Sequence, residues 1–113
     1  MKVYKKLVRD RIPEIAAKNN QTPVIRILQK DSDYKKELGK KLLEEVEEYL
    51  SDGKIEELAD IAEVILAILD FENISLKEFK KIREDKKRAR GGFSDRIFLE
   101  RVEENDSRKP FNF

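Results

Sequence analysis

The stretch 61-IAEVILAILDF-71 constrains the fold most, because it combines the length of a helix with apolar residues on nearly every side. When residues 54–72 are placed on a helical wheel, apolar side chains occupy almost the whole circumference. A helix of this kind is buried on most sides. A chain of 113 residues has a modest core and too little surface of its own to cover such a helix. We therefore expect a second copy of the chain to complete the core.

Two carboxylates, Glu57 and Asp60, lie inside this apolar helix, one turn apart. An ionised carboxylate without a partner is strongly disfavoured in apolar surroundings, so the pair requires positive charge nearby. One interpretation is a set of structural ion pairs with Lys or Arg from a neighbouring helix. The other is that Glu45 and Glu48, on the preceding helix, face Glu57 and Asp60 around one or two divalent ions. Each pair is spaced i, i+3, so both members project to the same side of their helix.

The remaining sequence predicts a mainly all-α fold, an antiparallel bundle of about four helices. Besides the helix at 54–72, helices are expected at about 12–19, from the cap 31-DSD-33 through Leu50, and at 76–90. Ser75 and Glu78 form a capping-box signature, and Gly91-Gly92 ends the last helix.

Two short segments, 24-VIRIL-28 and 96-RIFLERV-102, have the β-branched or alternating pattern of strands. We expect them to pair as a small two-stranded β accessory to the helices. No repeat or linker interrupts the chain, so residues 1–102 form one predicted domain. The polar segment 103–113 is expected to be a flexible tail.

The charge balance and the apolar segments of the sequence indicate which partners and which cellular location to expect. Lys and Arg number 25 against 24 Asp and Glu, a net charge of +1, which argues against a nucleic-acid partner. The N-terminal sequence has no apolar region of signal-peptide length, and Glu63 and Asp70 interrupt the longest apolar segment. We therefore expect a cytoplasmic protein that has no membrane partner.

The chain contains neither cysteine nor histidine. This absence excludes Ser-His-Asp and Cys-His catalysis. Any metal site must use oxygen ligands, which suit Mg²⁺ or Mn²⁺ rather than Zn²⁺ or copper. Carboxylates gathered from two helices would form such a site and would keep positions open for water and for substrate phosphate oxygens.

The pattern Glu45-x-x-Glu48 followed by Glu57-x-x-Asp60 resembles the MazG-like all-α nucleoside triphosphate pyrophosphatases. That superfamily includes phosphoribosyl-ATP pyrophosphohydrolase and the dimeric dUTPases. The flanking motifs 4-YKKLVRDRIP-13 and 90-RGGFSDRIFLE-100 are similar to its branch of phosphoribosyl-ATP pyrophosphohydrolase-like, house-cleaning nucleotide pyrophosphatases. Together these motifs extend the resemblance over nearly the whole domain.

The resemblance implies a homodimer, or a dimer of dimers, that hydrolyses canonical or non-canonical nucleoside triphosphates to monophosphate and pyrophosphate. The cofactor would be Mg²⁺, with Mn²⁺ as the alternative, and the metal ligands would be Glu45, Glu48, Glu57 and Asp60. Glu44 completes the family's Glu-Glu-x-x-Glu run. Glu44 and Glu45 are the candidate catalytic carboxylates, and the choice of a general base stays open.

Hydrolysis of a triphosphate requires cations where negative charge develops. The candidate substrate-binding residues are Lys6 and Arg9 of the first flanking motif, Arg90 and Arg96 of the second, and Lys86 of the basic run before the second. Structural roles are also open, because Arg9 beside Asp10 could pin the N-terminal segment and the basic run at 86–90 complements a helix dipole.

Two other functions stay open beside nucleotide hydrolysis. One is a phosphoribosyl-ATP pyrophosphohydrolase on the same scaffold. The other is a non-catalytic helical dimer that holds a protein partner, although such a module has no need for Glu57 and Asp60 inside an apolar helix.

Overall fold

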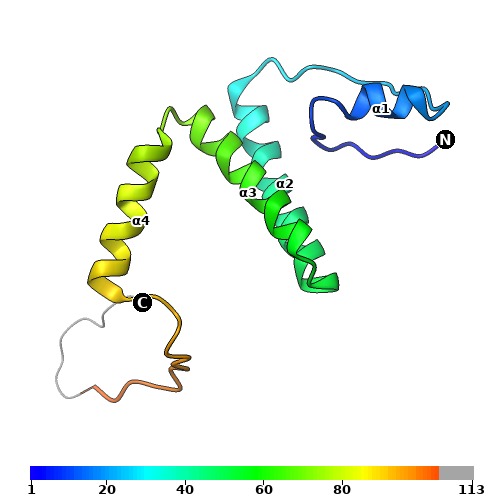
Figure 1. The fold of residues 1–113 in the computed structure, drawn as a ribbon. Helices are drawn as coiled ribbons and strands as arrows, with labels where there is room; N and C mark the ends of the chain where they lie inside the picture. The colour runs from blue at the N-terminus through cyan, green and yellow to red at the C-terminus, as the bar shows by residue number, and fades with distance from the viewer. Residues whose placement is uncertain (105–113) are drawn as a thin grey trace. The chain divides into compact units, whose positions relative to one another are not determined.

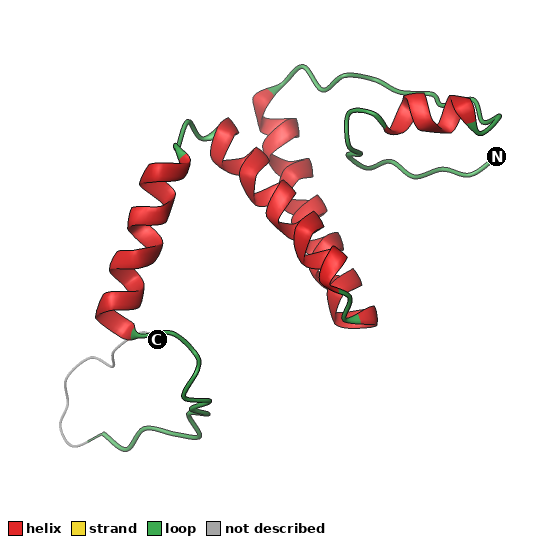
Figure 2. Cartoon of the chain, in the orientation of Figure 1, coloured by secondary structure: helices red, strands yellow, loops and turns green. Residues whose placement is uncertain are grey.

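The computed structural model describes residues 1–104, which contain four α-helices and no strand (Figures 1 and 2). The prediction of an all-α chain is therefore confirmed for these residues. Most of the expected tail, residues 105–113, lies outside them. The helices are α1 (Ile12–Lys18), α2 (Asp31–Asp52), α3 (Ile55–Phe71) and α4 (Leu76–Arg90).

By its internal contacts the chain divides into two units. The first, Met1–Phe79, holds α1, α2, α3 and the first residues of α4. The second begins at Lys80 and holds the rest of α4 and the segment that follows it. Within the described part of the chain, no helix is both long enough and apolar enough to cross a membrane.

The central element of the first unit is a hairpin of α2 and α3, which lie side by side in Figure 1. Gly53 joins them with φ 68°, a left-handed conformation that a glycine adopts without a Cβ penalty. Its N–H donates to the carbonyl of Tyr49 at 2.7 Å and closes the last turn of α2. At the other end, the rings of Tyr34 and Phe71 meet edge to face, with centroids 5.5 Å apart. The hairpin is thus fixed at both ends.

Burial inside this hairpin is limited to a few side chains. Leu38 of α2 and Val64 of α3 are 5% and 9% exposed, and they are the buried apolar residues among those described. The single chain does not cover all of the apolar residues of α3, since Ile55, Leu58 and Leu66 are exposed. The expectation that a second copy covers them stays a prediction. Two helices can cover only one side of each other, so the remaining apolar face of α3 meets solvent.

The predicted two-stranded accessory is wrong for the described residues. Segments 24–28 and 96–102 have no strand structure and belong to different units. Their apolar residues are exposed, as Val24 at 95% and Ile97 at 84% show. Strand propensity reflects packing against a neighbouring surface, and an isolated pair of short strands is marginal in water.

The helix ends follow the predicted caps in one place and differ in another. At α4 the Ser75 Oγ accepts the N–H of Glu78 at 3.1 Å and donates to its Oε1 at 3.2 Å, which confirms the capping signature. At α2 the N-cap is Lys30, without a side-chain hydrogen bond. Asp31 and Asp33 lie instead in the first turn, where negative charge complements the helix dipole.

Two glycines, Gly39 inside α2 and Gly53 directly after it, test the geometry of the hairpin turn. A Cβ would have open space at both Gly53 and Gly39, so only the backbone distinguishes them. Gly53→Ala should lower the free energy of unfolding by about 1 kcal/mol, because alanine resists a left-handed conformation. Gly39→Ala, inside the helix, should raise it by about 0.5–1 kcal/mol. Urea unfolding of both variants checks this; equal effects would contradict the turn geometry.

Candidate metal centre

The hairpin brings three carboxylates from two helices to one place. Glu45 comes from α2, while Glu57 and Asp60 come from consecutive turns of α3. One ligand oxygen from each lies within 4.8 Å of the others. This spacing follows from the local sequence, since the i, i+3 pair on α3 presents both carboxylates to the side that faces α2.

Burial makes this cluster different from an ordinary acidic surface. Glu45 is 7% exposed and is the buried charged residue among those described. Glu57 is half-buried. Two oxygens, Glu45 Oε2 and Glu57 Oε2, are shielded from solvent and have no hydrogen-bond partner within residues 1–104. Buried carboxylate oxygens are nearly always paired, so these two indicate a missing positive or donor group.

Cations from the chain itself neutralise part of the cluster. Arg9 Nη2 lies 2.7 Å from Asp60 Oδ1, and Lys41 Nζ lies 3.3 Å from Glu45 Oε1. The structural ion pairs that the sequence left open are therefore partly present. They come from the N-terminal segment and from α2 itself. Glu57 takes part in no ion pair among the described residues, so the neutralisation is incomplete.

Burial and incomplete neutralisation raise the pKa values of two carboxyl groups, Glu57 and Glu45. Desolvation, followed by the charge of Asp52 and by contacts with Glu48 and Asp60, raises the pKa of Glu57 to about 7. Desolvation likewise raises the pKa of Glu45, with Glu48 and Asp60 adding to the shift and Lys41 opposing it. Near neutral pH, the cluster therefore resists full ionisation unless further positive charge is supplied.

Two other predicted residues lie beside the cluster without belonging to it. Glu48 is exposed and is not one of the three grouped carboxylates, although its charge acts on both Glu45 and Glu57. Glu44 is held by Lys6 at 2.6 Å and by Lys41 at 2.7 Å. Burial alone would raise the pKa of Glu44, but these hydrogen bonds outweigh burial and keep it below the ordinary value.

The predicted substrate-binding cations fall into both units. Lys6 and Arg9 contact carboxylates at or beside the cluster. Lys86, Arg90 and Arg96 belong to the second unit, and their side chains are exposed. Arg90 lies in the last turn of α4, where cations complement the helix dipole. A substrate-binding role for all five residues stays a prediction.

Sequence reasoning assigned no role to Lys41, yet Lys41 links the cluster to its surroundings. Its ammonium group bridges Glu44 and Glu45, which follow it by three and four residues on α2. That spacing is a recognisable helical pair in the sequence. The partial burial of Lys41 could not be predicted, because the cavity that it lines is formed together with the N-terminal segment, far away in the chain.

Comparison with known proteins gives no match: no family model, no curated protein and no solved structure matches this chain. The resemblance to the MazG-like pyrophosphatases therefore stays a prediction that rests on the sequence motifs.

The raised pKa of Glu57 has a consequence for stability that can be measured. The carboxyl titrates near its ordinary 4.5 in the unfolded chain and at about 7 in the folded one. Between these values the folded state binds more protons, so this group lowers the free energy of unfolding as pH rises. Without metal, Glu57→Gln should therefore gain stability relative to wild type as pH rises across this interval.

Thermal unfolding in EDTA at a series of pH values makes the comparison. The matched control is Glu56→Gln, the adjacent exposed residue, which removes the same charge outside the cluster. A difference between wild type and Glu57→Gln that stays constant with pH would contradict the crowding of carboxylates at this site.

Proposed function

We propose that the chain is a divalent-metal-dependent nucleotide pyrophosphohydrolase, which converts a nucleoside triphosphate and water to a monophosphate and pyrophosphate. The observation that carries the proposal is the incomplete neutralisation of Glu45, Glu57 and Asp60. Each of the two glutamates keeps a buried oxygen without a partner, although Arg9 and Lys41 lie nearby. A divalent cation would satisfy both oxygens at once.

The donor set fits Mg²⁺, with Mn²⁺ as the alternative. All three grouped ligands are carboxylates, the hard oxygen donors that these ions prefer. Glu45, Glu57 and Asp60 would hold the ion, and Glu48 is the fourth candidate ligand from the motif. Three or four protein oxygens leave positions for water and phosphate oxygens, as phosphate-handling magnesium sites do.

The ion would polarise a phosphate and lower the pKa of a bound water. The chain's own residues would supply orientation and charge. Arg9 at Asp60 and Lys6 at Glu44 place cations beside the cluster, where a phosphate oxygen could accept their hydrogen bonds. Because both oxygens of Glu44 are already held by ammonium groups, Glu44 suits the positioning of Lys6 and Lys41 better than proton abstraction.

Self-association is part of the proposal. The hairpin exposes Leu43 and Leu50 on α2 as well as Leu58 and Leu66 on α3. Leucines at helical spacing on two adjacent helices match the surface that a second hairpin covers in a helical bundle. A homodimer, or a dimer of dimers, would bury this surface and lengthen the short core of the single chain.

The decisive experiment measures pyrophosphate release from a panel of canonical and modified nucleoside triphosphates, with Mg²⁺ and with EDTA. We expect Mg²⁺-dependent release that falls by about 100-fold or more in Glu57→Gln and Asp60→Asn, because each removes a ligand. Glu56→Gln should keep wild-type rates, since Glu56 is exposed on α3 outside the cluster. Light scattering on the same preparations should show at least a dimer.

Each alternative predicts a different result. Release that persists in EDTA would contradict the metal site. If a folded dimer releases pyrophosphate from no nucleotide in the panel, the alternatives are a phosphoribosyl-ATP pyrophosphohydrolase and a module that holds a protein partner. An assay of phosphoribosyl-ATP hydrolysis distinguishes these two. A monomer in light scattering would contradict the self-association alone.

A further inference from the structure

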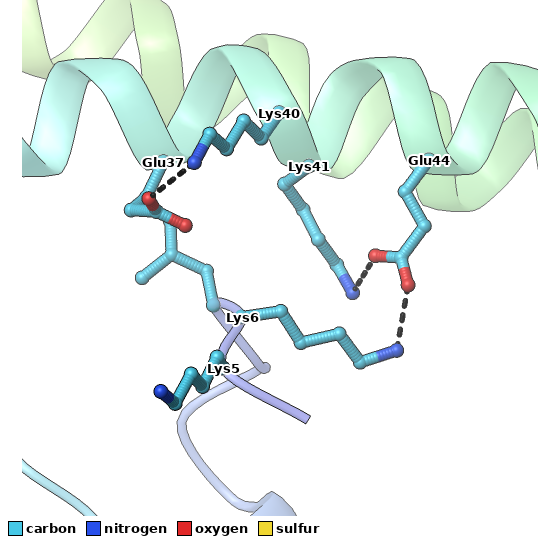
Figure 3. Close-up of a pocket in the computed structure, with 7 residues that line it drawn as sticks. Lys5, Lys6, Glu37, Lys40, Lys41 and Glu44 are labelled. Atoms are coloured by element: carbon cyan, nitrogen blue, oxygen red, sulfur yellow. Dashed lines mark hydrogen bonds and ion pairs between the residues drawn. The ribbon is translucent and has the colours of Figure 1, made fainter. Parts of the chain in front are cut away.

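A second feature of the first unit is a cavity of about 230 Å³ between the N-terminal segment and α2. Four lysines line it, two from each side: Lys5, Lys6, Lys40 and Lys41. Figure 3 shows Lys6 and Lys41 directed at Glu44 from the two sides, while Lys40 pairs with Glu37. The sequence motifs single out only Lys6 among these four lysines.

The charge of this lysine pocket is unbalanced. Its lining holds four lysines against two glutamates. Glu44 is shared by Lys6 and Lys41, and Lys41 also pairs with Glu45, outside the lining, at 3.3 Å. The ion pair of Lys40 and Glu37 is 3.4 Å long, and it is weak because the Lys40 side chain is exposed while Glu37 is half-buried. Lys5 has no ion pair among the described residues. Positive charge therefore remains available for an anion.

The size of the cavity restricts the anion. Sites that enclose drug-sized molecules are about 300–1,000 Å³, so this one is too small for a whole nucleotide. A volume of this order holds the equivalent of several water molecules of about 30 Å³ each, which suits a short chain of phosphates. Lysine ammonium groups bind phosphate as point charges and tolerate varied geometry.

The lysine pocket is also connected to the carboxylate cluster. Lys41 lines the cavity and at the same time reaches Glu45 Oε1 at 3.3 Å. Its side chain is only 17% exposed. An anion in the pocket would therefore lie one side chain away from the candidate metal ligands.

We propose that the lysine pocket binds two linked phosphates, either as the end of a nucleoside triphosphate or as released pyrophosphate. Its role as a subsite of the reaction rests on the proposed function, but its affinity for a condensed phosphate does not. Lys40, Lys41 and Lys5 then become phosphate-binding residues beside Lys6. The cluster takes the cation, and the lysine pocket takes the anionic end of the same substrate.

The test is calorimetric titration of the full chain with inorganic pyrophosphate in EDTA at low salt. Lys5→Ala and Lys40→Ala should each weaken binding by about tenfold or more, the value of one charge-assisted hydrogen bond. The matched control is Lys36→Ala, one turn from Lys40 on α2 and outside the cavity lining. It should change affinity by less than about twofold, because Lys36 lies outside the cavity and donates no hydrogen bond to a pyrophosphate bound there.

Three results would contradict phosphate binding in the lysine pocket. They are no binding of pyrophosphate, a loss of affinity in Lys36→Ala equal to that in Lys40→Ala, or binding of sulfate as tight as that of pyrophosphate. Titration with a non-hydrolysable nucleoside triphosphate separates substrate from product. If Lys40→Ala weakens binding of the triphosphate as much as binding of pyrophosphate, the pocket takes the terminal phosphates of the substrate. If it weakens binding of pyrophosphate alone, the pocket takes the product. Because the readout is metal-free binding, intact pyrophosphate binding without Mg²⁺-dependent hydrolysis would refute only the proposed function.

Discussion

The packing of α2 against α3 is the contact on which the rest of the first unit depends. The left-handed turn at Gly53 reverses the chain, and the Tyr34 and Phe71 rings join the opposite end of the hairpin. Between these points, Glu45 of α2 is set against the two carboxylates of α3. No single helix could gather these groups. Loosening the hairpin would therefore separate the candidate ligands before it altered any one of them.

Electrostatic repulsion within the cluster opposes that packing. Desolvation, together with the neighbouring carboxylates, raises the pKa of Glu57. Arg9, from a segment distant in sequence, neutralises only Asp60. Such an arrangement costs stability, and binding of the proposed divalent ion would restore it. Local features that disfavour the folded state are common at functional sites, where they serve binding rather than folding.

The local elements could be predicted from the sequence because their causes are local. The apolar period, the Ser75 cap and Gly53 determine where helices begin and end, and i, i+3 spacing places Glu57 beside Asp60. The prediction of a strand at 24–28 was wrong, because strand formation depends on a neighbouring strand or surface that the residue pattern does not specify. The cover over the outer face of α3 could not be predicted for the same reason, since it depends on what packs against that face.

The contacts of Lys6 and Arg9 lie beyond sequence reasoning, because they join residues 38 and 51 positions apart. The lysine pocket depends on the same path of the N-terminal segment.

The central proposal is that Glu45, Glu57 and Asp60 bind a divalent cation. Titration with Mn²⁺, followed by electron paramagnetic resonance, tests it most directly. At about pH 8, above the pKa of Glu57, we predict saturable binding that Glu57→Gln abolishes and Glu56→Gln preserves. Equal, unsaturable binding by all three proteins would contradict the account and leave the cluster a set of structural ion pairs.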